Sequence, residues 1–378
     1  MDIKNFKAGK YKKGFEYKYF MPSKINHKFI FSNPSIDKLL EKASLKLGEL
    51  NSFSRFVPDI DMFIKMHVFK EAVVSSKIEG TRTNMEEALS EEFAINPEKR
   101  NDWLEVNNYV KAINYAIDEL KKLPLSNRLI RNTHKILLSS GRGKHKTPGE
   151  FRKSQNWIGG ATLADAVFIP PAHTELPELL SDFEAFLNNN EVPLPHLIKI
   201  AIAHYQFETI HPFLDGNGRI GRLLITLYLV ANNILEKPLL YLSDFFERNR
   251  ELYYQKLTLV RTNNDLEQWL KFFLVGVVET AEKSVLTLKN IMELKSYIEK
   301  EEILNMGKRS KNAMQLLQKL FSFPVVSVKK VQELTGLSPR AANNLVTIFI
   351  DRNILKEITG YQRNRIFVFE KYLKLFED

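Results

Sequence analysis

Twelve consecutive residues, from His211 to Arg222, contain the residue types that phosphate chemistry requires. They read His-Pro-Phe-Leu-Asp-Gly-Asn-Gly-Arg-Ile-Gly-Arg. Gly216 and Gly218 on either side of Asn217 let the backbone turn with positive φ and present successive N–H groups. A helix is expected to begin there, and its unpaired N–H groups and positive dipole end attract anions. The spacing therefore predicts a site for a phosphate chain.

The side chains of this segment, called the signature loop below, extend that interpretation. Arg219 and Arg222 are three residues apart, so they share a face of the first turn and would clamp phosphate oxygens. Asp215 could hold a magnesium ion that bridges those phosphates. His211 is available as a general base near neutral pH, and Phe213 is expected to pin the loop to the core. The structural alternative is a glycine-rich helix start whose arginines pair with carboxylates.

Two common nucleotide-binding motifs are excluded. The loop lacks the lysine and glycine spacing of a Walker motif, and no strand precedes it as a Rossmann fingerprint requires. A metal-dependent hydrolase is a further alternative, because His196, His204 and His211 recur at helical spacing beside Asp215. No His-Glu-x-x-His pattern supports it.

A second motif, Ser75-Ser76-Lys77-Ile78-Glu79-Gly80, lies at the end of an expected helix. Ser75 and Glu79 are four residues apart and share one helix face. The plain interpretation is a helix C-terminus that is capped by Gly80, with Glu79 in solvent.

The composition indicates a globular protein of two or three domains, with 378 residues, 44% apolar residues and no cysteine. The absence of cysteine excludes disulfides, a thiolate zinc site and a cysteine nucleophile. No apolar run is long enough to span a bilayer, and no apolar stretch follows the Lys-rich start, so we expect a cytoplasmic protein.

Periodicity predicts a mainly α fold. We expect an extended arm over residues 1–30, a flap with short β-runs at 155–158 and 166–169 around Gly159-Gly160, and helices elsewhere in the body. The expected helices cover residues 36–50, 61–77, 84–93, 101–120, 126–138, 176–187, 195–209 and 217–234, with two or three more before residue 300. The aromatic residues Phe245, Phe246, Tyr253 and Tyr254 are expected in the core.

The last 70 residues follow the order of a winged helix. Helices are expected over 312–321, 328–335 and 339–352, the third with Ser338 as N-cap and Pro339 at its first position. Two β-like runs, 355–359 and 365–369, follow. Residues 301–378 hold 13 Lys+Arg against 8 Asp+Glu, which favours an acidic partner such as DNA. The candidate DNA contacts are Arg340, Asn343, Arg363 and Arg365. The alternative is a protein-interaction module of the same fold.

The signature loop matches, position for position, the signature of the Fic family, His-Pro-Phe-x-Asp/Glu-Gly-Asn-Gly-Arg-x-x-Arg. Residues 204–210 and Pro148-Gly149-Glu150-Phe151-Arg152 also resemble the family, and we judge that the resemblance covers residues 30–290. It implies a Fic-type helical core with a β-hairpin flap, and an enzyme that transfers AMP from ATP, with Mg²⁺, to a Ser, Thr or Tyr hydroxyl of a protein, itself or another.

The resemblance also implies a role for each residue. His211 would deprotonate the target hydroxyl, and Asp215 would bind magnesium. The phosphates would be held by the nucleotide-binding residues Gly216, Asn217, Gly218, Arg219 and Arg222. The flap would dock the target as an added strand, through Gly159, Gly160, Ala161, Thr162, Leu163, Ala166 and Val167. A tyrosine within residues 241–254 would contact adenine.

The second motif resembles the family's inhibitory helix, Ser/Thr-x-x-x-Glu-Gly/Asn, placed N-terminal to the core. This implies that Glu79 pairs with Arg222 and denies it to the γ-phosphate, with Ser75 beside it. Some members use this glutamate to remove AMP, so a bifunctional enzyme stays open. A DNA-binding regulator with a nucleotide-sensing body is the alternative from another class, and homodimers recur in such families. The expected domains are 1–95, 96–300 and 308–378.

Overall fold

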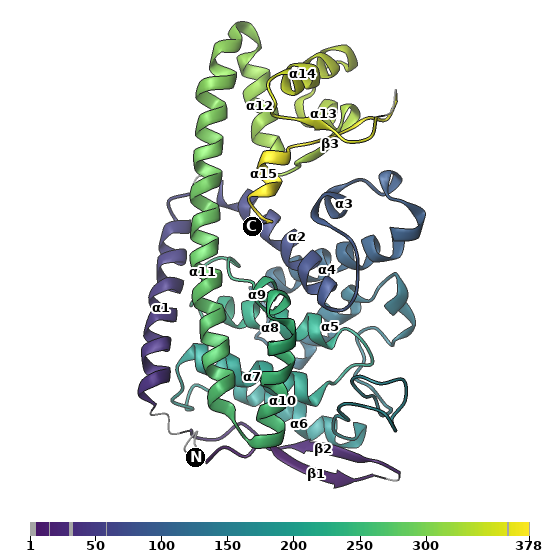
Figure 1. Ribbon diagram of the computed structural model, residues 1–378, viewed down its shortest axis with the longest axis vertical. Helices are drawn as coiled ribbons and strands as arrows, with labels where there is room; N and C mark the ends of the chain where they lie inside the picture. Colours follow the sequence, from purple (N-terminus) through teal and green to yellow (C-terminus); the bar gives the residue numbers. More distant parts are fainter. Residues whose placement is uncertain (1–4, 15, 30–32, 58, 361–362, 378) are drawn as a thin grey trace.

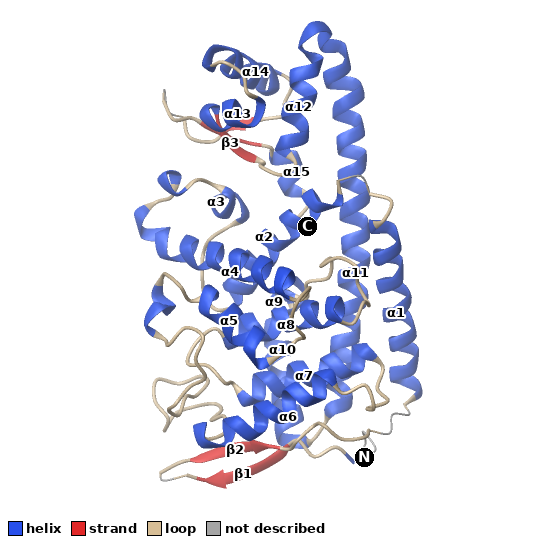
Figure 2. Cartoon of the chain, turned by 180° about the vertical axis from the view of Figure 1, so that it is seen from behind, coloured by secondary structure: helices blue, strands red, loops and turns tan. Residues whose placement is uncertain are grey.

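The computed structural model describes residues 5–14, 16–29, 33–57, 59–360 and 363–377. Helices dominate it, as Figures 1 and 2 show. Those of the body are α1 (Pro34–Ser54), α2 (Ile60–Ile78), α3 (Met85–Leu89), α4 (Arg100–Glu119), α5 (Asn127–Leu137), α6 (Leu176–Asn188), α7 (His196–Ile210), α8 (Asn217–Ala231), α9 (Ser243–Arg248), α10 (Arg250–Asn263) and α11 (Leu266–Tyr297). Within the described residues, no helix has the length and apolarity to cross a membrane.

Helix α7 forms the centre of the body. Every residue of it from Leu197 to Ile210 is buried, and apolar residues occur on all of its faces. The signature loop joins α7 to α8, which is buried from Arg219 to Leu229. The loop is therefore held between two core helices, and its geometry is set by the packing around them.

Helix α11 runs along the body, and α1 lies beside it in both views (Figures 1 and 2). The contact face of α1 carries Ile36, Ala43, Leu47 and Leu50, all buried at helical spacing. The predicted helix over 36–50 is confirmed and is longer at both ends. Helix α2 follows α1 and brings Ser75 and Ser76 into the interior, where both are buried.

The N-terminal arm, predicted as an extended segment, contains a β-hairpin. Strands β1 (Gly9–Lys13) and β2 (Lys18–Pro22) pair antiparallel, with Tyr11 opposite Phe20. Strand β2 is the more buried of the two, since Tyr19 and Phe20 are buried, whereas Tyr11 in β1 is 56% exposed. The expected residues 1–4, 15 and 30 lie outside the described residues.

The flap contains less regular structure than the two predicted β-runs. A single β-bridge joins Ile158 to Phe168. The N–H of Phe20, in β2, donates to the carbonyl of Ile169 at 2.9 Å. The N-terminal hairpin thus supports one side of the flap.

The C-terminal region contains α12 (Ser310–Leu320), α13 (Val328–Thr335), α14 (Pro339–Asp351), α15 (Glu370–Lys374) and the strands β3 (Val325–Ser327), β4 (Lys356–Glu357) and β5 (Ile366–Val368). The strands form an antiparallel sheet in the order β3-β5-β4. Ser338 Oγ accepts from the N–H of Ala341, so the predicted cap of α14 is confirmed. The sequence missed β3, whose three residues are too few for a visible period. Tyr361 and Gln362, between the two predicted β-runs, lie outside the described residues.

Candidate active site

The signature loop is closed on itself by one amide side chain. His211 and Gly216 take positive φ values of 50° and 78°, and α8 begins at Asn217. The Asn217 side chain accepts from the N–H of Phe213 and donates to its carbonyl, both at 2.8 Å. The predicted helix start is confirmed, and the two hydrogen bonds of the Asn217 side chain fix the turn before it.

His134 supports the loop from α5, a role that the sequence did not reveal. Its Nε2 donates to the carbonyl of Asp215 at 2.9 Å, and its Nδ1 accepts from the N–H of Gly149 at 2.9 Å. The ring stacks on Phe213 with centroids 3.7 Å apart. Burial lowers the pKa of His134 to about 4, so the ring is neutral at pH 7. Phe213 is fully buried, as predicted.

Arg152 and Asn156, which lead into the flap, hold the other side of the loop. The Arg152 guanidinium donates to the carbonyls of His211 at 3.0 Å and Pro171 at 2.5 Å. Burial lowers its pKa to about 10, so it remains charged at pH 7. Asn156 donates to the carbonyls of His211 and Phe213 at 3.2 and 2.9 Å. These donors orient the loop's carbonyls away from the site.

His211 is neutral and has one free ring nitrogen. Its Nδ1 lies 3.3 Å from the carbonyl of Glu208, which favours the proton on that nitrogen. Burial lowers the pKa of His211 to about 4, against a smaller opposing effect of that hydrogen bond. Nε2 makes no hydrogen bond within the described parts of the chain, and it can therefore accept a proton at pH 7.

Arg222 is held by the second motif. Its Nε donates to Ser75 Oγ at 2.8 Å, and its Nη2 donates to the Ser75 carbonyl at 2.9 Å and to Glu79 Oε1 at 2.6 Å. The Arg222 side chain is 1% exposed and that of Glu79 is 34% exposed. Burial opposes ionisation of both groups, but each charge outweighs it, so the pKa of Arg222 is raised and that of Glu79 lowered. The interpretation of Glu79 as a solvated residue at a helix end is wrong.

Gly218 is a glycine because of this carboxylate. It is helical, so the prediction of a positive φ at this position is wrong. A Cβ at Gly218 would overlap Glu79 Oε1 and lie 2.9 Å from Arg222 Nη1. Glu79 thus lies directly over the first turn of α8, where the backbone N–H groups point outward.

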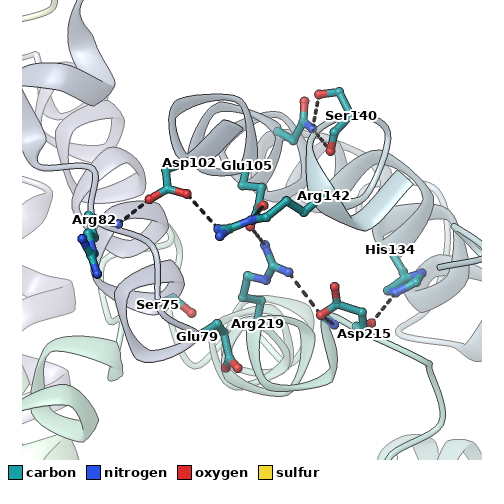
Figure 3. Close-up of polar contacts among 12 residues, drawn as sticks. Ser75, Glu79, Arg82, Asp102, Glu105, His134, Ser140, Arg142, Asp215 and Arg219 are labelled. Carbon is teal, nitrogen blue, oxygen red and sulfur yellow. Dashed lines mark hydrogen bonds and ion pairs between the residues drawn. The ribbon is translucent and has the colours of Figure 1, made fainter. Parts of the chain in front are cut away.

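Arg219 takes different partners from Arg222. Its Nη1 lies 3.5 Å from Glu105 Oε2 and its Nη2 lies 3.6 Å from Asp215 Oδ1, as Figure 3 shows. Glu105, on α4, also receives Arg142 at 2.8 Å. The buried Nε and Nη1 of Arg219 make no hydrogen bond among the residues that the structure describes. Buried guanidinium donors without acceptors are suited to a phosphate oxygen.

Asp215 can serve as a single magnesium ligand. Its Oδ1 accepts from the N–H of Gly216 at 2.6 Å, and its side chain is 42% exposed. Its Oδ2 makes no hydrogen bond or ion pair within the described part of the chain. Magnesium is commonly bound by one or two carboxylates together with substrate phosphates and water. The described residues contain no cluster of three or more potential ligand side chains.

The three histidines of the metal-hydrolase alternative do not converge. His204 donates from Nδ1 to the Gly221 carbonyl and accepts at Nε2 from Tyr253, both at 2.8 Å. Burial lowers the pKa of His204 to about 3, so it is a neutral support for α8. His196 contacts Tyr228 instead. Phe245, Phe246 and Tyr253 are buried, as predicted, but the expectation that Tyr254 lies in the core is wrong. Tyr254 is 41% exposed and is the tyrosine of this region that a ligand could reach, since Tyr241 is 6% exposed.

The flap exposes a short edge beside the loop. Gly159 and Gly160 take positive φ values of 69° and 75°. Asp165 accepts from the N–H groups of Ala161 and Thr162 and closes the tip. Val167 is 80% exposed. The remaining predicted residues, Leu163 and Ala166, are half-buried on the same segment.

The predicted DNA contacts lie far from the loop, on the C-terminal region. Arg340 and Arg363 are exposed. Arg365 donates to Asn343 at 2.9 Å and pairs with Glu357 at 3.5 Å. Asn343 and Arg365 line a cleft whose other wall includes Glu91 and Phe93. The structure thus brings three of the four candidates, Asn343, Arg363 and Arg365, to the walls of clefts that face the body.

Comparison with known sequences agrees with this geometry. Residues 38–118 match the family described as Fic/DOC family N-terminal, and residues 124–229 match the Fic/DOC family. Protein adenylyltransferase Fic of Aedes aegypti is 35% identical over 129 residues, which are 33% of this chain and 22% of that protein. Protein adenylyltransferase Fic of Drosophila yakuba is 28% identical over 179 residues, or 46% of this chain and 32% of that protein. The chain thus spans less than a third of the length of these relatives.

Solved structures share the fold. A Fic family protein from Desulfovibrio desulfuricans G20 aligns with a TM-score of 0.58 at 18% identity, over 91% of this chain and 98% of that one. A Fic domain containing signaling protein from Bacteroides thetaiotaomicron aligns with a TM-score of 0.54 at 19% identity, over 66% of this chain and 97% of that one. This chain therefore carries a Fic/DOC family N-terminal domain followed by a Fic/DOC family domain, with the signature loop inside the second.

Proposed function

We propose that this chain is a protein adenylyltransferase that transfers AMP from ATP to a protein hydroxyl. The observation that carries the proposal is the juxtaposition at the start of α8. There the buried Arg219 has unsatisfied donors, and the neutral His211 lies at the other end of the same loop. A phosphate chain and a base for a nucleophile can thus be held by one rigid turn.

The transfer is an in-line displacement at the α-phosphate. His211 Nε2 takes the proton of the target hydroxyl as its oxygen forms the new bond to phosphorus. The bond from the α-phosphate to the bridging oxygen breaks, and pyrophosphate leaves with that electron pair. The N–H groups of the first turn of α8 and the guanidinium of Arg219 hold the phosphates in line. Magnesium, held by Asp215, would neutralise charge on the pyrophosphate.

The target segment is proposed to dock along the flap. The exposed run around Val167 has one backbone edge bonded to Ile158, and an extended peptide can pair with an edge of this kind. Main-chain pairing would place a target hydroxyl near His211 without demanding a particular side-chain sequence. The flap residues named above would form this edge.

Glu79 is proposed to restrain the enzyme. It occupies Arg222 and covers the first turn of α8 at Gly218. ATP can reach its productive pose only when its γ-phosphate replaces this carboxylate on Arg222, because both need the same guanidinium face. Removal of Glu79 should therefore raise transfer.

Residues 308–378 are proposed to form a winged helix that binds DNA, with residues 1–95 and 96–300 as the N-terminal and catalytic regions. Helices α12, α13 and α14 followed by β4 and β5, with β3 between α12 and α13, support the winged helix.

Intact mass after incubation with ATP and magnesium tests the enzyme. The variants are wild type, Glu79→Gly, and Glu79→Gly with His211→Ala. A gain of one AMP in Glu79→Gly alone would support transfer, restraint and base together. If no variant gains mass and none labels any protein in a lysate, the proposal is wrong.

A further inference from the structure

Both signature arginines are held by glutamates that bracket one stretch of chain. Glu79 follows the last residue of α2 and holds Arg222, and Glu105 is in the second turn of α4 and faces Arg219. Residues 80–104, which connect these two glutamates, extend away from the body and then come back to it. The two sides of this stretch meet where the N–H of Arg82 donates to Asp102, at 2.8 Å, and Arg142 pairs with Asp102 at 2.8 Å (Figure 3).

The middle of this stretch reaches the C-terminal region. Residues 85–98, called the acidic segment below, form one wall of a cleft of about 760 Å³. Its lining includes Glu86, Phe93 and Pro97 on one side and Ile358, Arg363 and Asn364 on the other. A second cleft of about 480 Å³ continues it past Lys329, Asn343 and Arg365. Figures 1 and 2 both show α3 beside the C-terminal region.

The two walls carry opposite charge but are not joined by ion pairs. The acidic segment has five glutamates and no lysine or arginine. Lys329, Arg363 and Arg365 face it from the other wall. Within the described ranges, no ion pair links the acidic segment to residues 308–377, since its glutamates Glu87 and Glu92 pair with Lys99 and Arg100. Walls that attract each other only across a cleft can separate at low cost.

The C-terminal region is attached to the body at a different place, the first half of α2. The Phe376 ring lies 6.1 Å from Phe63 and 5.5 Å from His67, centroid to centroid. Lys65 Nζ lies 3.5 Å above the Phe323 ring. These apolar contacts fix residues 308–377 on α2 and hold the face of α14 and the wing in front of the acidic segment. Anything large that binds this face must displace the acidic segment.

We propose that a DNA duplex binds the cleft face of the C-terminal region in place of the acidic segment, and that this displacement withdraws Glu79 from Arg222. The inference rests on the proposed DNA binding of residues 308–378 for its ligand, and on the proposed AMP transfer only for its enzymatic readout. The connection from Glu79 to α3 is five residues long, and it begins at Gly80, which has a φ of 99° and no neighbour within 4 Å of its Cβ position. Movement of the acidic segment reaches Glu79 when the hydrogen bond from Arg82 to Asp102 breaks as well, and Gly80 then lets the end of α2 turn away from Arg222.

A duplex fits this face better than an acidic peptide does. Asn343 is on α14, Arg365 immediately precedes β5, and the two side chains are hydrogen-bonded to each other, which presents an amide and a guanidinium together to base edges. Lys329 and Arg363 flank them at the positions of phosphate contacts. Glu86, Glu87 and Glu91 line the same clefts as these cations, so the protein's own negative charge faces this surface when no duplex is bound.

Binding is tested first, without reference to activity. The probe is a fluorescein-labelled 24-base-pair duplex of random sequence, measured by anisotropy at several salt concentrations. Neutralising the wall with Glu86→Gln, Glu91→Gln and Glu92→Gln should tighten binding about fivefold. The control with the same charge change, Glu41→Gln, Glu191→Gln and Glu293→Gln, alters exposed residues away from the cleft and should change it less than twofold. The variant Lys329→Ala, Arg340→Ala, Arg363→Ala should lose most of the affinity.

The coupling between duplex binding and the position of Glu79 is tested through thermodynamic linkage. If duplex binding weakens the contact of Glu79 with Arg222, loss of that contact must in turn favour duplex binding. If the duplex withdraws Glu79, Glu79→Gly should itself tighten duplex binding about threefold or more. The duplex should also raise amide hydrogen exchange in residues 85–98. Equal affinity of wild type and Glu79→Gly, or unchanged exchange, would refute the coupling. If the cleft variant and the control variant gain the same duplex affinity, competition by the acidic segment is refuted.

The enzymatic readout separates this inference from the proposed function. The duplex should increase AMP incorporation by wild type at least fivefold and leave that of Glu79→Gly unchanged. If Glu79→Gly is active and the duplex neither binds nor stimulates, the inference fails and the function stands. If no variant transfers AMP but binding and exchange behave as expected, the function fails and the coupling of the two sites stands.

Discussion

The Glu79→Gly substitution should destabilise the free protein while it releases the active site. Arg222 is 1% exposed, and Glu79 is its anionic partner, at 2.6 Å. Breaking a buried ion pair costs about 3–5 kcal/mol because the remaining charge has no counterion. Glu79 is one-third exposed and Ser75 keeps two hydrogen bonds to Arg222, so we expect a smaller loss of about 2–3 kcal/mol in the free energy of unfolding.

ATP should reverse this loss. Its γ-phosphate supplies the missing anion in Glu79→Gly, whereas in wild type it must compete with Glu79 for the same guanidinium. A ligand at 100 times its dissociation constant stabilises a protein by about 2.7 kcal/mol. The thermal midpoint of the variant should therefore lie several degrees below wild type without ATP and rise to about the wild-type value with ATP and magnesium.

Differential scanning fluorimetry with and without ATP measures both effects. Glu79→Gln separates charge from contact, since an amide still accepts from Arg222 but does not neutralise it, and should give an intermediate loss. Lys77→Ala removes an exposed pair with Glu247 on the same helix end and should change stability by at most about 0.5 kcal/mol. A Glu79→Gly variant as stable as wild type, with no greater response to ATP, would refute this reasoning.

Three further predictions concern the supports of the loop and the buried titratable groups. Asn217→Asp, placed in the Glu79→Gly background, cannot donate to the Phe213 carbonyl and should lower the AMP transfer rate at least about a hundredfold without unfolding the protein, as circular dichroism would check. Tyr253→Phe removes the O–H that His204 accepts, and chemical denaturation should show a loss of about 1–2 kcal/mol. Four buried histidines have pKa values lowered by burial to about 3 or 4, and two buried glutamates have pKa values raised to about 7; they are His67, His134, His204, His211, Glu71 and Glu208. As the pH falls from 6.5 to 4.5, the excess of protons that the unfolded chain binds at these six groups rises to about two, so stability should fall, by about 2.7 kcal/mol per pH unit in the lower half of this range. Urea unfolding at several pH values checks this, and a flat profile would contradict the assigned burial.

The sequence predicted elements whose determinants are local. Apolar spacing placed the helices, Ser338 marked the start of α14, and the signature loop identified the turn before α8. These signals lie within a few residues of the structure they specify, so one sequence is enough to find them. Strand β3 was not predicted because it has three residues and pairs with the distant β5, whereas β1 and β2 pair locally but lack the alternation of buried and exposed residues that marks a strand.

The residues that support the site were not predicted either, because their partners are distant in the sequence. His134 contacts Asp215 across 81 positions, and Arg152 contacts His211 across 59. A histidine or arginine that donates a hydrogen bond to a backbone carbonyl leaves no spacing pattern in the sequence, because any residue can supply that carbonyl. Only Glu79 was found at such a range, across 143 positions from Arg222, and there the resemblance to a known motif supplied the link.

The two glutamates that bracket the acidic segment are not equivalent, and their difference indicates which one moves. Glu105 has a side chain 9% exposed and receives both Arg142 and Arg219, so its loss would leave two cations without a partner. Glu79 is 34% exposed, has one cationic partner and precedes a glycine with open space around it. Withdrawing Glu79 costs one ion pair, which a γ-phosphate can replace, whereas withdrawing Glu105 would disturb Arg219 and its contact to Asp215. A movement of the acidic segment should therefore release Arg222 and leave Arg219 in place, which frees one phosphate contact while the other stays ordered.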